Sequence, residues 1–215
     1  AGKNFVFNKE TGSTNQDVKA LAEKGAPSGT LVVADSQLAG RGRRGRDWIS
    51  PPGKDIYMSL LLRPSCMPDR ASALTLVMAL SVIEAIDELE DFKDKCGIKW
   101  PNDIYWNKKK LAGILIENDL MGKQLEKCII GVGINLNQED FVSDAPNPVS
   151  VWQITGHATE PLTVLRKIMQ RFSNYYGQIK KGETEELVDQ YHKALFRRVG
   201  FHKFRIPGGE EFEAR

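Results

Sequence analysis

The sequence predicts an α+β fold, in which a mixed, largely antiparallel sheet is flanked by helices. Three patterns support this prediction. The apolar, β-branched runs at 30–35 and 56–62 are typical of buried strands. Apolar residues at helical spacing extend over 74–89 and 161–182. Short turns join several of the expected strands, which favours antiparallel pairing over a strictly alternating parallel sheet.

The first half of the chain is expected to contain four regular elements and one long loop. In order, they are a helix from Ser13 to Gly25, a strand at 30–35, a loop, a strand at 56–62 and an amphipathic helix at 74–89. The helix start is indicated by Ser13 and Thr14 followed by Gln16 and Asp17, the pattern of a capping box. The loop contains two consecutive prolines at 51–52, which regular elements do not tolerate.

The second half is expected to continue with strands and then helices. In order, they are a strand from Ile98, a hairpin at 104–116 with its turn at 107–110, a strand at 128–136, helices at 161–182 and 183–196, and a hairpin at 201–215. Gly131 and Gly133 interrupt the strand at 128–136, which indicates that a backbone or a ligand approaches closely there. We divide the chain into a domain at 1–197 and the beginning of a truncated β module at 198–215.

The composition is that of an ordinary folded protein. The chain is 41% hydrophobic and 27% charged, and its net charge of +2 does not describe a protein coated in basic surface. Cys66, Cys96 and Cys128 form no zinc-binding spacing, so we expect reduced thiols in a cytoplasmic protein. No apolar run is long enough to cross a membrane, and the amino end lacks the long apolar stretch of a signal peptide.

The arginine–glycine loop, residues 40–46, has the sequence Gly-Arg-Gly-Arg-Arg-Gly-Arg. It matches the G-x-G-x-x-G pattern of a dinucleotide-binding turn, but residues 47–53 cannot begin the helix that such a turn requires. Arginine side chains match phosphate and carboxylate oxygens, and glycines let backbone N–H groups approach an anion. The loop therefore predicts a phosphate-containing ligand, with a solvated basic loop or a contact to nucleic-acid backbone as alternatives.

Several further segments, in one order, resemble the biotin protein ligase family. Residues 40–48 match its G-R-G-R-x-G-R-x-W loop, 99–103 its K-W-P-N-D segment, 110–115 its K-L-A-G-I-L segment, 131–135 its G-x-G-I-N strand and 13–15 its S-T-N segment. Gln37 precedes the loop at the family's spacing. Each motif is weak or moderate alone, but together they extend across residues 13–137, which makes the resemblance specific.

The resemblance implies a fold similar to the class II aminoacyl-tRNA synthetase core, followed by a small SH3-like barrel that begins near Phe201. It also implies two substrates, ATP and biotin, together with Mg²⁺. Biotin would be activated to biotinyl-5′-AMP with release of pyrophosphate. It would then be transferred to a lysine on the biotin carboxyl carrier domain of a biotin-dependent carboxylase. The expected partners include no membrane, and a homodimer remains open.

By the same resemblance, the residues that contact biotin or its adenylate come from four segments. They are Ser13, Thr14, Asn15, Gln37, Gly40, Arg41, Gly42, Arg43, Trp48, Lys110 and Gly113. Ser13 and Thr14 could cap a helix, either in place of this role or together with it, and Trp48 could be a core residue. Catalytic roles are expected for Lys110, Arg43 and Asp103. Lys110 would bridge the biotin carboxylate and the phosphate, and Arg43 would lie nearest the developing charge.

The expected nucleotide-binding residues are Arg44, Arg46, Lys99, Asn102 and Asn135. Arg44 and Arg46 are alternatively loop-closing residues, and Lys99 is alternatively part of a structural ion pair. Asp103 is expected either to help coordinate Mg²⁺ or to orient the incoming lysine, and no side chain is assigned as a metal ligand. Lys108 and Lys109 are expected in a solvated turn.

Two other functions compete with this interpretation. Lipoate ligases share the fold and the adenylate chemistry, but their R-R-x-x-G-G-G type of loop is missing from this sequence. A transcription regulator would need a DNA-binding domain, and only about a dozen residues precede Ser13, too few for a winged helix. We therefore expect no binding of nucleic acid through this chain.

Overall fold

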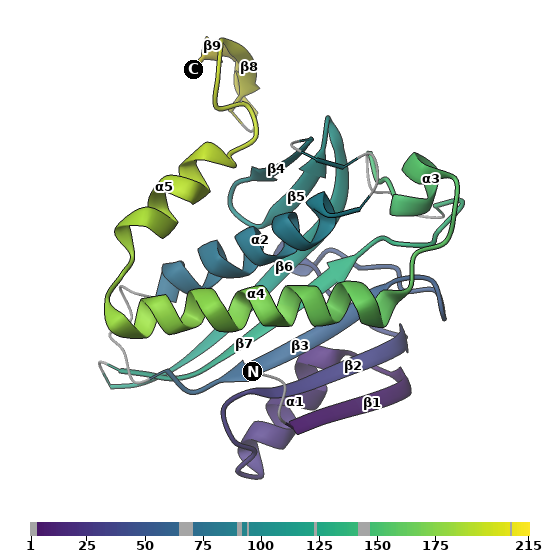
Figure 1. Ribbon diagram of the computed structural model, residues 1–215, viewed down its shortest axis with the longest axis vertical. Helices are drawn as coiled ribbons and strands as arrows, with labels where there is room; N and C mark the ends of the chain where they lie inside the picture. Colours follow the sequence, from purple (N-terminus) through teal and green to yellow (C-terminus); the bar gives the residue numbers. More distant parts are fainter. Residues whose placement is uncertain are drawn as a thin grey trace.

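The computed structural model describes residues 4–64, 71–89, 92–93, 95–122, 124–141, 147–206 and 208–215 (Figure 1). The strands are β1 (Asn4–Thr11), β2 (Thr30–Gln37), β3 (Ile56–Leu62), β4 (Cys96–Lys99), β5 (Asp103–Trp106), β6 (Lys109–Met121), β7 (Gln124–Ile134), β8 (His202–Arg205) and β9 (Glu211–Ala214). The helices are α1 (Thr14–Glu23), α2 (Ala71–Asp87), α3 (Val151–Thr155), α4 (Pro161–Lys181) and α5 (Glu185–Lys193), with a short 3₁₀ turn, η1 (Arg43–Gly45).

The main sheet has seven strands in the order β1-β2-β3-β7-β6-β5-β4. β1 and β2 are parallel, and every other neighbouring pair is antiparallel. This topology confirms the predicted mixed, largely antiparallel sheet. The parallel pair arises because α1 carries the chain from the end of β1 back to the start of β2, as parallel neighbours require a crossover.

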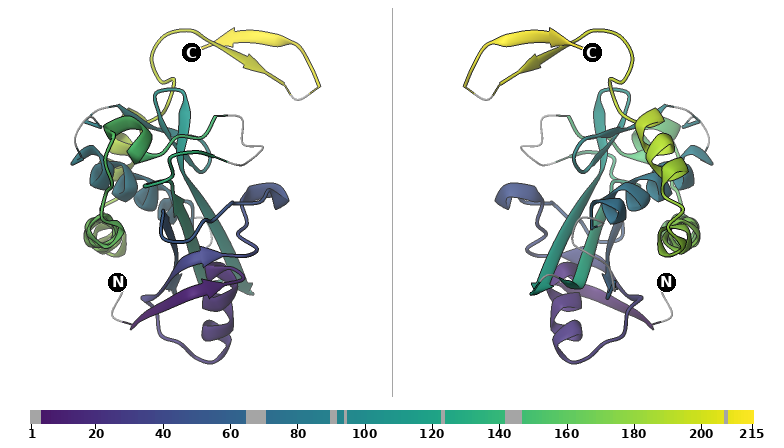
Figure 2. Two further views of the ribbon diagram at one scale, coloured as in Figure 1. Left: turned by 90° about the vertical axis from the view of Figure 1, so that its right-hand side faces the viewer. Right: turned by 90° about the vertical axis from the view of Figure 1, so that its left-hand side faces the viewer.

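Helices cover the two faces of this sheet unequally (Figure 2). α2, α4 and α5 lie on one side, where the side chains of Met58, Leu60 and Ile130 enter the larger core. α1 lies on the other side and packs with a smaller apolar cluster that includes Leu61 and Ile129. Because successive strand residues point to opposite faces, Leu60 and Leu61 belong to different cores. The segment that carries η1 projects on the α1 side.

The prediction that the helix over 74–89 is amphipathic was wrong. α2 packs against α4 and α5 on one side and against β4, β5 and β6 on another. A helix in the middle of two layers must be apolar around most of its circumference. Its buried residues accordingly include Leu74, Val77, Met78, Ala79, Leu80, Ser81, Val82, Ile83, Ala85 and Ile86. The helical stripe predicted for 161–182 is confirmed in α4, which ends at Gly182 in the left-handed conformation.

Other elements differ from the prediction in extent. β1, α3 and the hairpin that β6 forms with β7 were not predicted. α5 ends at Lys193 because the next residues pair with the edge strand β4. Ile98 N donates to Ala194 O at 2.7 Å, and Phe196 N donates to Ile98 O at 2.9 Å. These residues therefore extend the sheet instead of the helix.

The hairpin predicted at 201–215 is confirmed as a separate two-stranded sheet of β8 and β9, which stands away from the main sheet (Figures 1 and 2). The rings of Phe204 and Phe212 stack across it with centroids 5.9 Å apart. The domain division at 197 and the SH3-like barrel stay predictions. Cys96 and Cys128 form no disulfide within the described residues, and Cys66 lies outside those residues. Within the described helices, none is long and apolar enough to span a membrane.

Candidate functional site

A pocket of about 1230 Å³ opens on the α1 face of the sheet. Its walls come from the start of α1, the end of β2, the arginine–glycine loop, the turn between β4 and β5, β6, β7 and the loop that follows β7. Most of the predicted site residues line it, namely Ser13, Thr14, Asn15, Gln37, Arg41, Gly42, Arg43, Arg46, Trp48, Lys99, Asn102, Asp103, Lys110, Gly113 and Asn135. Gly40 does not line it, and the side chain of Arg44 lies outside the described part of the chain.

The floor of the pocket is made of glycines. Gly113 and Gly133 face each other across β6 and β7, and the Trp48 ring lies against both. A Cβ atom at Gly133 would lie 2.6 Å from Trp48 Cε2, and one at Gly113 would lie 2.8 Å from Trp48 Cζ3. A Cβ at Gly131 would lie 2.2 Å from Asn15 Oδ1. A backbone or a ligand was predicted to approach closely at Gly131 and Gly133, but the groups that do so are the side chains of Asn15 and Trp48.

The start of α1 is tied to β2 by Gln37. Thr14 N donates to Gln37 Oε1 at 2.9 Å, and Gln37 Nε2 donates to Ser50 Oγ at 3.1 Å. Ser13 occupies the N-cap position of α1, but its side chain makes no capping hydrogen bond. The capping role considered for Ser13 is therefore wrong, because Gln37 supplies the acceptor for the first turn. Ser13 and Thr14 are buried beside the pocket.

Two residues next to Asn15 escaped the sequence analysis. Asn15 Nδ2 donates to Glu117 Oε2 at 2.6 Å. Ser59 is fully buried, and its Oγ lies 2.5 Å from Asn15 Oδ1 and 2.7 Å from Thr14 Oγ1. The signal that could have identified Ser59 is its position as the one serine in β3, among large apolar side chains, where a buried hydroxyl requires a partner.

Lys110 and Asp103 form an ion pair on one wall of the pocket. Lys110 Nζ lies 2.8 Å from Asp103 Oδ1, and it also lies 5.4 Å from the centre of the Trp48 ring. Both charged side chains are about three-quarters buried. The prediction that Lys110 lies in the 107–110 turn was wrong, because β6 begins at Lys109. Lys108 and Lys109 are exposed, as expected.

Asn102 and Asn135 hold the surrounding loops. Asn102 Nδ2 donates to Ile114 O at 2.8 Å, and Asn135 Nδ2 donates to Val149 O at 3.1 Å. Lys99 Nζ donates to Tyr105 OH at 3.0 Å, and within the described residues it has no carboxylate partner. The ion pair considered for Lys99 is therefore not formed there. The nucleotide-binding roles of these residues stay predictions.

The arginine–glycine loop closes on itself through backbone hydrogen bonds. Gly42 N donates to Arg46 O at 2.6 Å, and Trp48 N donates to Gly40 O at 2.9 Å. Gly40 is packed so tightly that a Cβ would lie 2.5 Å from Trp48 O. Gly45 has a φ of 72°, which a residue with a side chain rarely adopts. The exposed side chains of Arg41, Arg43 and Arg46 consequently stand at the rim of the pocket.

A buried carboxyl group, also missed from the sequence, joins β3 to the loop after β7. Asp55 accepts hydrogen bonds from Leu136 N at 2.7 Å, from Tyr57 OH at 3.1 Å and from Gln138 Nε2. Burial raises the pKa of Asp55 to about 6, although these hydrogen bonds act in the opposite direction. Gln138 lines the pocket, so this cluster supports one of its walls.

The pocket therefore has two chemically different ends. Uncharged polar groups of Thr14, Asn15 and Gln37 meet at the start of α1, where Asn15 lies against Gly131. The Lys110 cation lies beside Trp48 and Gly113, and the loop arginines also line the pocket. Trp48 Nε1 is buried without a hydrogen-bond partner in the described residues, so it is available as a donor. The same residues contain no group of three His, Cys, Asp or Glu side chains that would hold a metal ion by itself. An anionic ligand with a small polar head fits this arrangement.

The chain is similar in sequence to proteins of one known family. Residues 8–135, more than half of the chain, match the biotin/lipoate A/B protein ligase family. The biotin–[acetyl-CoA-carboxylase] ligase of Paracoccus denitrificans is 36% identical over 173 residues, which cover 79% of this chain and 71% of that protein. The bifunctional ligase/repressor BirA of Bacillus subtilis is 38% identical over 178 residues, 81% of this chain. The match spans about half, 54%, of that relative's length.

A solved structure extends this similarity to the whole fold. The biotin protein ligase from Aquifex aeolicus, in complex with biotin and ATP, superimposes with a TM-score of 0.81 at 31% identity. The superposition covers 99% of this chain and 86% of the Aquifex chain. The predicted class II aminoacyl-tRNA synthetase-like core is consistent with this neighbour. From its motifs and these relatives, the chain belongs to the biotin/lipoate A/B protein ligase family.

Proposed function

We propose that this chain activates biotin with ATP to form biotinyl-5′-AMP, and then transfers biotin to a lysine of a biotin carboxyl carrier domain. The observation that carries the proposal is the division of one pocket into an uncharged polar end and a cationic end. Biotin has the matching division, because it carries a ureido group at one end and a carboxylate at the other. The names of the Paracoccus and Aquifex proteins support the same substrate.

The uncharged end suits the ureido ring. Thr14, Asn15 and Gln37 offer hydrogen-bond donors and acceptors that are already held by protein partners. Groups held in place before binding lose little entropy when the ligand arrives. The glycine floor and the Trp48 ring supply the apolar surface for the rest of the bicyclic ring.

The cationic end suits the first chemical step. An oxygen of the biotin carboxylate attacks the α-phosphorus of ATP, a new P–O bond forms, and the P–O bond to pyrophosphate breaks. Both reactants are anions, so cations must hold them together and stabilise the charge that develops on the phosphate. We assign this role to Lys110 and Arg43, and we assign the pyrophosphate to Arg44 and Arg46. Lys99, Asn102 and Asn135 are proposed for the nucleotide side.

The second step needs an acceptor lysine in its neutral form. Its amine attacks the carbonyl carbon of the mixed anhydride, the amide bond forms, the C–O bond to AMP breaks, and the nitrogen loses a proton. The Asp103 carboxylate lines the pocket beside Lys110, which supports the proposal that it orients the incoming amine. The rim arginines would be partly covered by the carrier domain during this step.

Mg²⁺ is proposed to enter with ATP. This cation commonly keeps several waters and takes one or two carboxylates together with substrate phosphates, so a pocket without a protein cage can accept it. Asp103 and Asp47 are the carboxylates that line the pocket. Bound there, Mg²⁺ would neutralise part of the phosphate charge. A cytoplasmic location and a homodimer remain predictions.

Two measurements test the proposed function. Isothermal titration should show binding of biotin and none of lipoate at the same concentration. With ATP present, the protein should exchange labelled pyrophosphate into ATP only when biotin is added, and it should add one biotin mass to a purified carrier domain. Tight binding of lipoate without binding of biotin would overturn the assignment in favour of a lipoate ligase.

A further inference from the structure

Four polar side chains form one line of contacts that leads from the pocket, past the buried Ser59, to the exposed Glu117 on β6. Thr14 Oγ1 lies 2.7 Å from Ser59 Oγ, Ser59 Oγ lies 2.5 Å from Asn15 Oδ1, and Asn15 Nδ2 lies 2.6 Å from Glu117 Oε2. They come from α1, β3 and β6, which makes the line a purely tertiary feature. The register of the sheet brings these side chains together. On β7, Gly131 lies opposite Ser59 of β3, and Ile129, two residues earlier, lies opposite Glu117 of β6.

The positions of the hydrogens follow from counting donors. A carboxylate has no hydrogen, so Asn15 must turn its Nδ2 toward Glu117 and its Oδ1 toward Ser59. An amide oxygen has no hydrogen either, so the single hydroxyl hydrogen of Ser59 must point to Asn15. Thr14 must then supply the hydrogen in its contact with Ser59. Every donor along the line therefore points toward Glu117.

This order has a consequence at the pocket. Thr14 Oγ1 also lies 3.1 Å from Gln37 Oε1, and the orientation of Gln37 is set because Thr14 N donates to the same Oε1. Once the Thr14 hydrogen points to Ser59, no hydrogen remains between these two oxygens. Thr14 and Gln37 both line the pocket, so they present it with a pair of acceptors. An N–H donor of a ligand is the group that satisfies such a pair.

Without a carboxylate at position 117, the order can reverse. The Asn15 amide is then free to turn, so that its Nδ2 donates to Ser59. Ser59 in turn donates to Thr14, and Thr14 donates to Gln37 Oε1. The acceptor pair disappears, although every side chain remains in place. The choice between the two orders thus depends on a residue that does not line the pocket.

We propose that Glu117 is a positioning residue that acts through Asn15 and Ser59 to make Thr14 and Gln37 a paired acceptor for a ligand N–H. Only the identity of this ligand N–H rests on the proposed function, and on biotin it is a ureido N–H. Gly131 is needed for the same arrangement, because only a residue without Cβ leaves room for the Asn15 amide.

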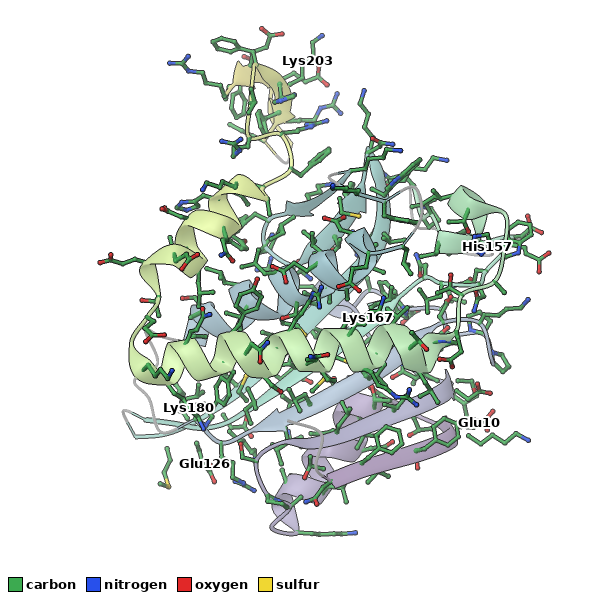
Figure 3. All side chains as sticks on the ribbon, in the orientation of Figure 1. Glu10, Glu126, His157, Lys167, Lys180 and Lys203 are labelled. Carbon is green, nitrogen blue, oxygen red and sulfur yellow. The ribbon has the colours of Figure 1, made fainter. Side chains whose placement is uncertain are left out.

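The test compares two ligands on several variants of the full chain. The ligands are biotin and biotin methylated on its ureido nitrogens, which has no N–H to donate. The main variant is Glu117→Leu, and Glu117→Asp keeps the carboxylate as a conservative rescue. Glu126→Leu is the matched control, because Glu126 is an exposed glutamate near the start of β7, at the far part of the same hairpin (Figure 3).

Wild type should bind biotin far more tightly than the methylated analogue. In Glu117→Leu, the Kd of biotin should rise about tenfold, the effect of losing one well-placed hydrogen bond, while the Kd of the analogue changes less than twofold. In pyrophosphate exchange, KM for biotin should rise with kcat little changed. Glu117→Asp should recover part of the discrimination, and Glu126→Leu should equal wild type.

A purely structural role of Glu117 would raise both Kd values together, and that result would overturn the proposal. Unchanged discrimination in Glu117→Leu would overturn it as well. If that variant does not fold, Ser59→Ala is the second test. It leaves the contact between Asn15 and Glu117 in place but lets the Thr14 hydrogen return to Gln37, so the same loss of discrimination is expected. Failure of wild type to bind biotin would count against the proposed function instead.

Discussion

Lys110 Nζ lies 2.8 Å from Asp103 Oδ1, across the hairpin that β5 and β6 form. Asp103 is the first residue of β5, and Lys110 is the second residue of β6, next to a register shift in the pairing of the two strands. With both side chains about three-quarters buried, the pair loses less of its attraction to solvent than an exposed pair does. The ammonium group is thereby held on the pocket wall before a ligand enters.

Replacement of Lys110 by alanine should abolish most biotinyl-AMP formation. Loss of one group that stabilises the charge of the transition state typically slows a reaction by a factor of about 100 to 1000. The rate is measured by pyrophosphate exchange at saturating biotin and ATP. Lys108→Ala, a change in the exposed turn, is the control and should retain full activity. Normal exchange by Lys110→Ala would remove the central assignment.

Replacement of Asp103 by asparagine should have a smaller effect on adenylation than the loss of Lys110. The ammonium remains, but it is no longer held, so we expect a decrease of about tenfold, the size of one charge-assisted hydrogen bond. The double variant tests the coupling between the two residues. Because Asp103 would act on this step through Lys110, adding Asp103→Asn to Lys110→Ala should cause little further loss of exchange. Fully multiplicative effects would show that the two residues act separately.

Replacement of Gly133 by alanine should weaken ligand binding while it leaves the fold stable. The added Cβ would lie 2.6 Å from Trp48 Cε2, so the indole must move off the floor of the pocket. Trp48 belongs to a loop, and the loop can shift without breaking the sheet. We expect the Kd of biotin to rise at least tenfold with an almost unchanged melting temperature. If the clash with the indole is the cause, Gly133→Ala should raise the Kd of biotin much less when Trp48 is also replaced by alanine.

Because the pKa of the Asp55 carboxyl group is raised in the folded protein, we expect the protein to become less stable as pH rises from about 4 to about 6. This pKa is about 6 in the folded chain against an ordinary value of 3.8 in an unfolded chain, so the folded state binds more protons between these limits. Deprotonation through this window should lower the free energy of unfolding by about 3 kcal/mol from this group alone. Urea denaturation of wild type at pH 4.5 and 7.5 measures most of this change, about 2 kcal/mol, because part of it occurs below pH 4.5.

Asp55→Asn is the matched comparison for this pH dependence, because asparagine has a similar shape and does not titrate. The variant should show a smaller loss of stability between the two pH values than wild type. An equal loss in both proteins would mean that other groups cause the dependence.

Local patterns in the sequence were sufficient for most of the elements. Gly182 and Pro161 bound α4 as predicted, because caps and breakers act on their own turn of helix. β1 was missed because its alternation of polar and apolar residues is incomplete, and Phe5 and Phe7 are half exposed on an edge strand. The extent of α5 was misjudged because the pairing of Phe196 with Ile98 outweighs local helix preference.

The sequence by itself also indicated most of the predicted residues that line the pocket, since the motifs that carry Gln37, Trp48 and Lys110 are contiguous and can be recognised without coordinates. Only the tertiary structure decided what those residues do to one another. Asn15 and Glu117 are separated by 102 positions, and nothing local in either segment indicates the other. The burial of Asp55, the position of Trp48 on two glycines and the direction of the Thr14 hydrogen all depend on segments brought together by packing. Hydrogen bonds and burial act over a few ångströms in space, whatever the separation along the chain.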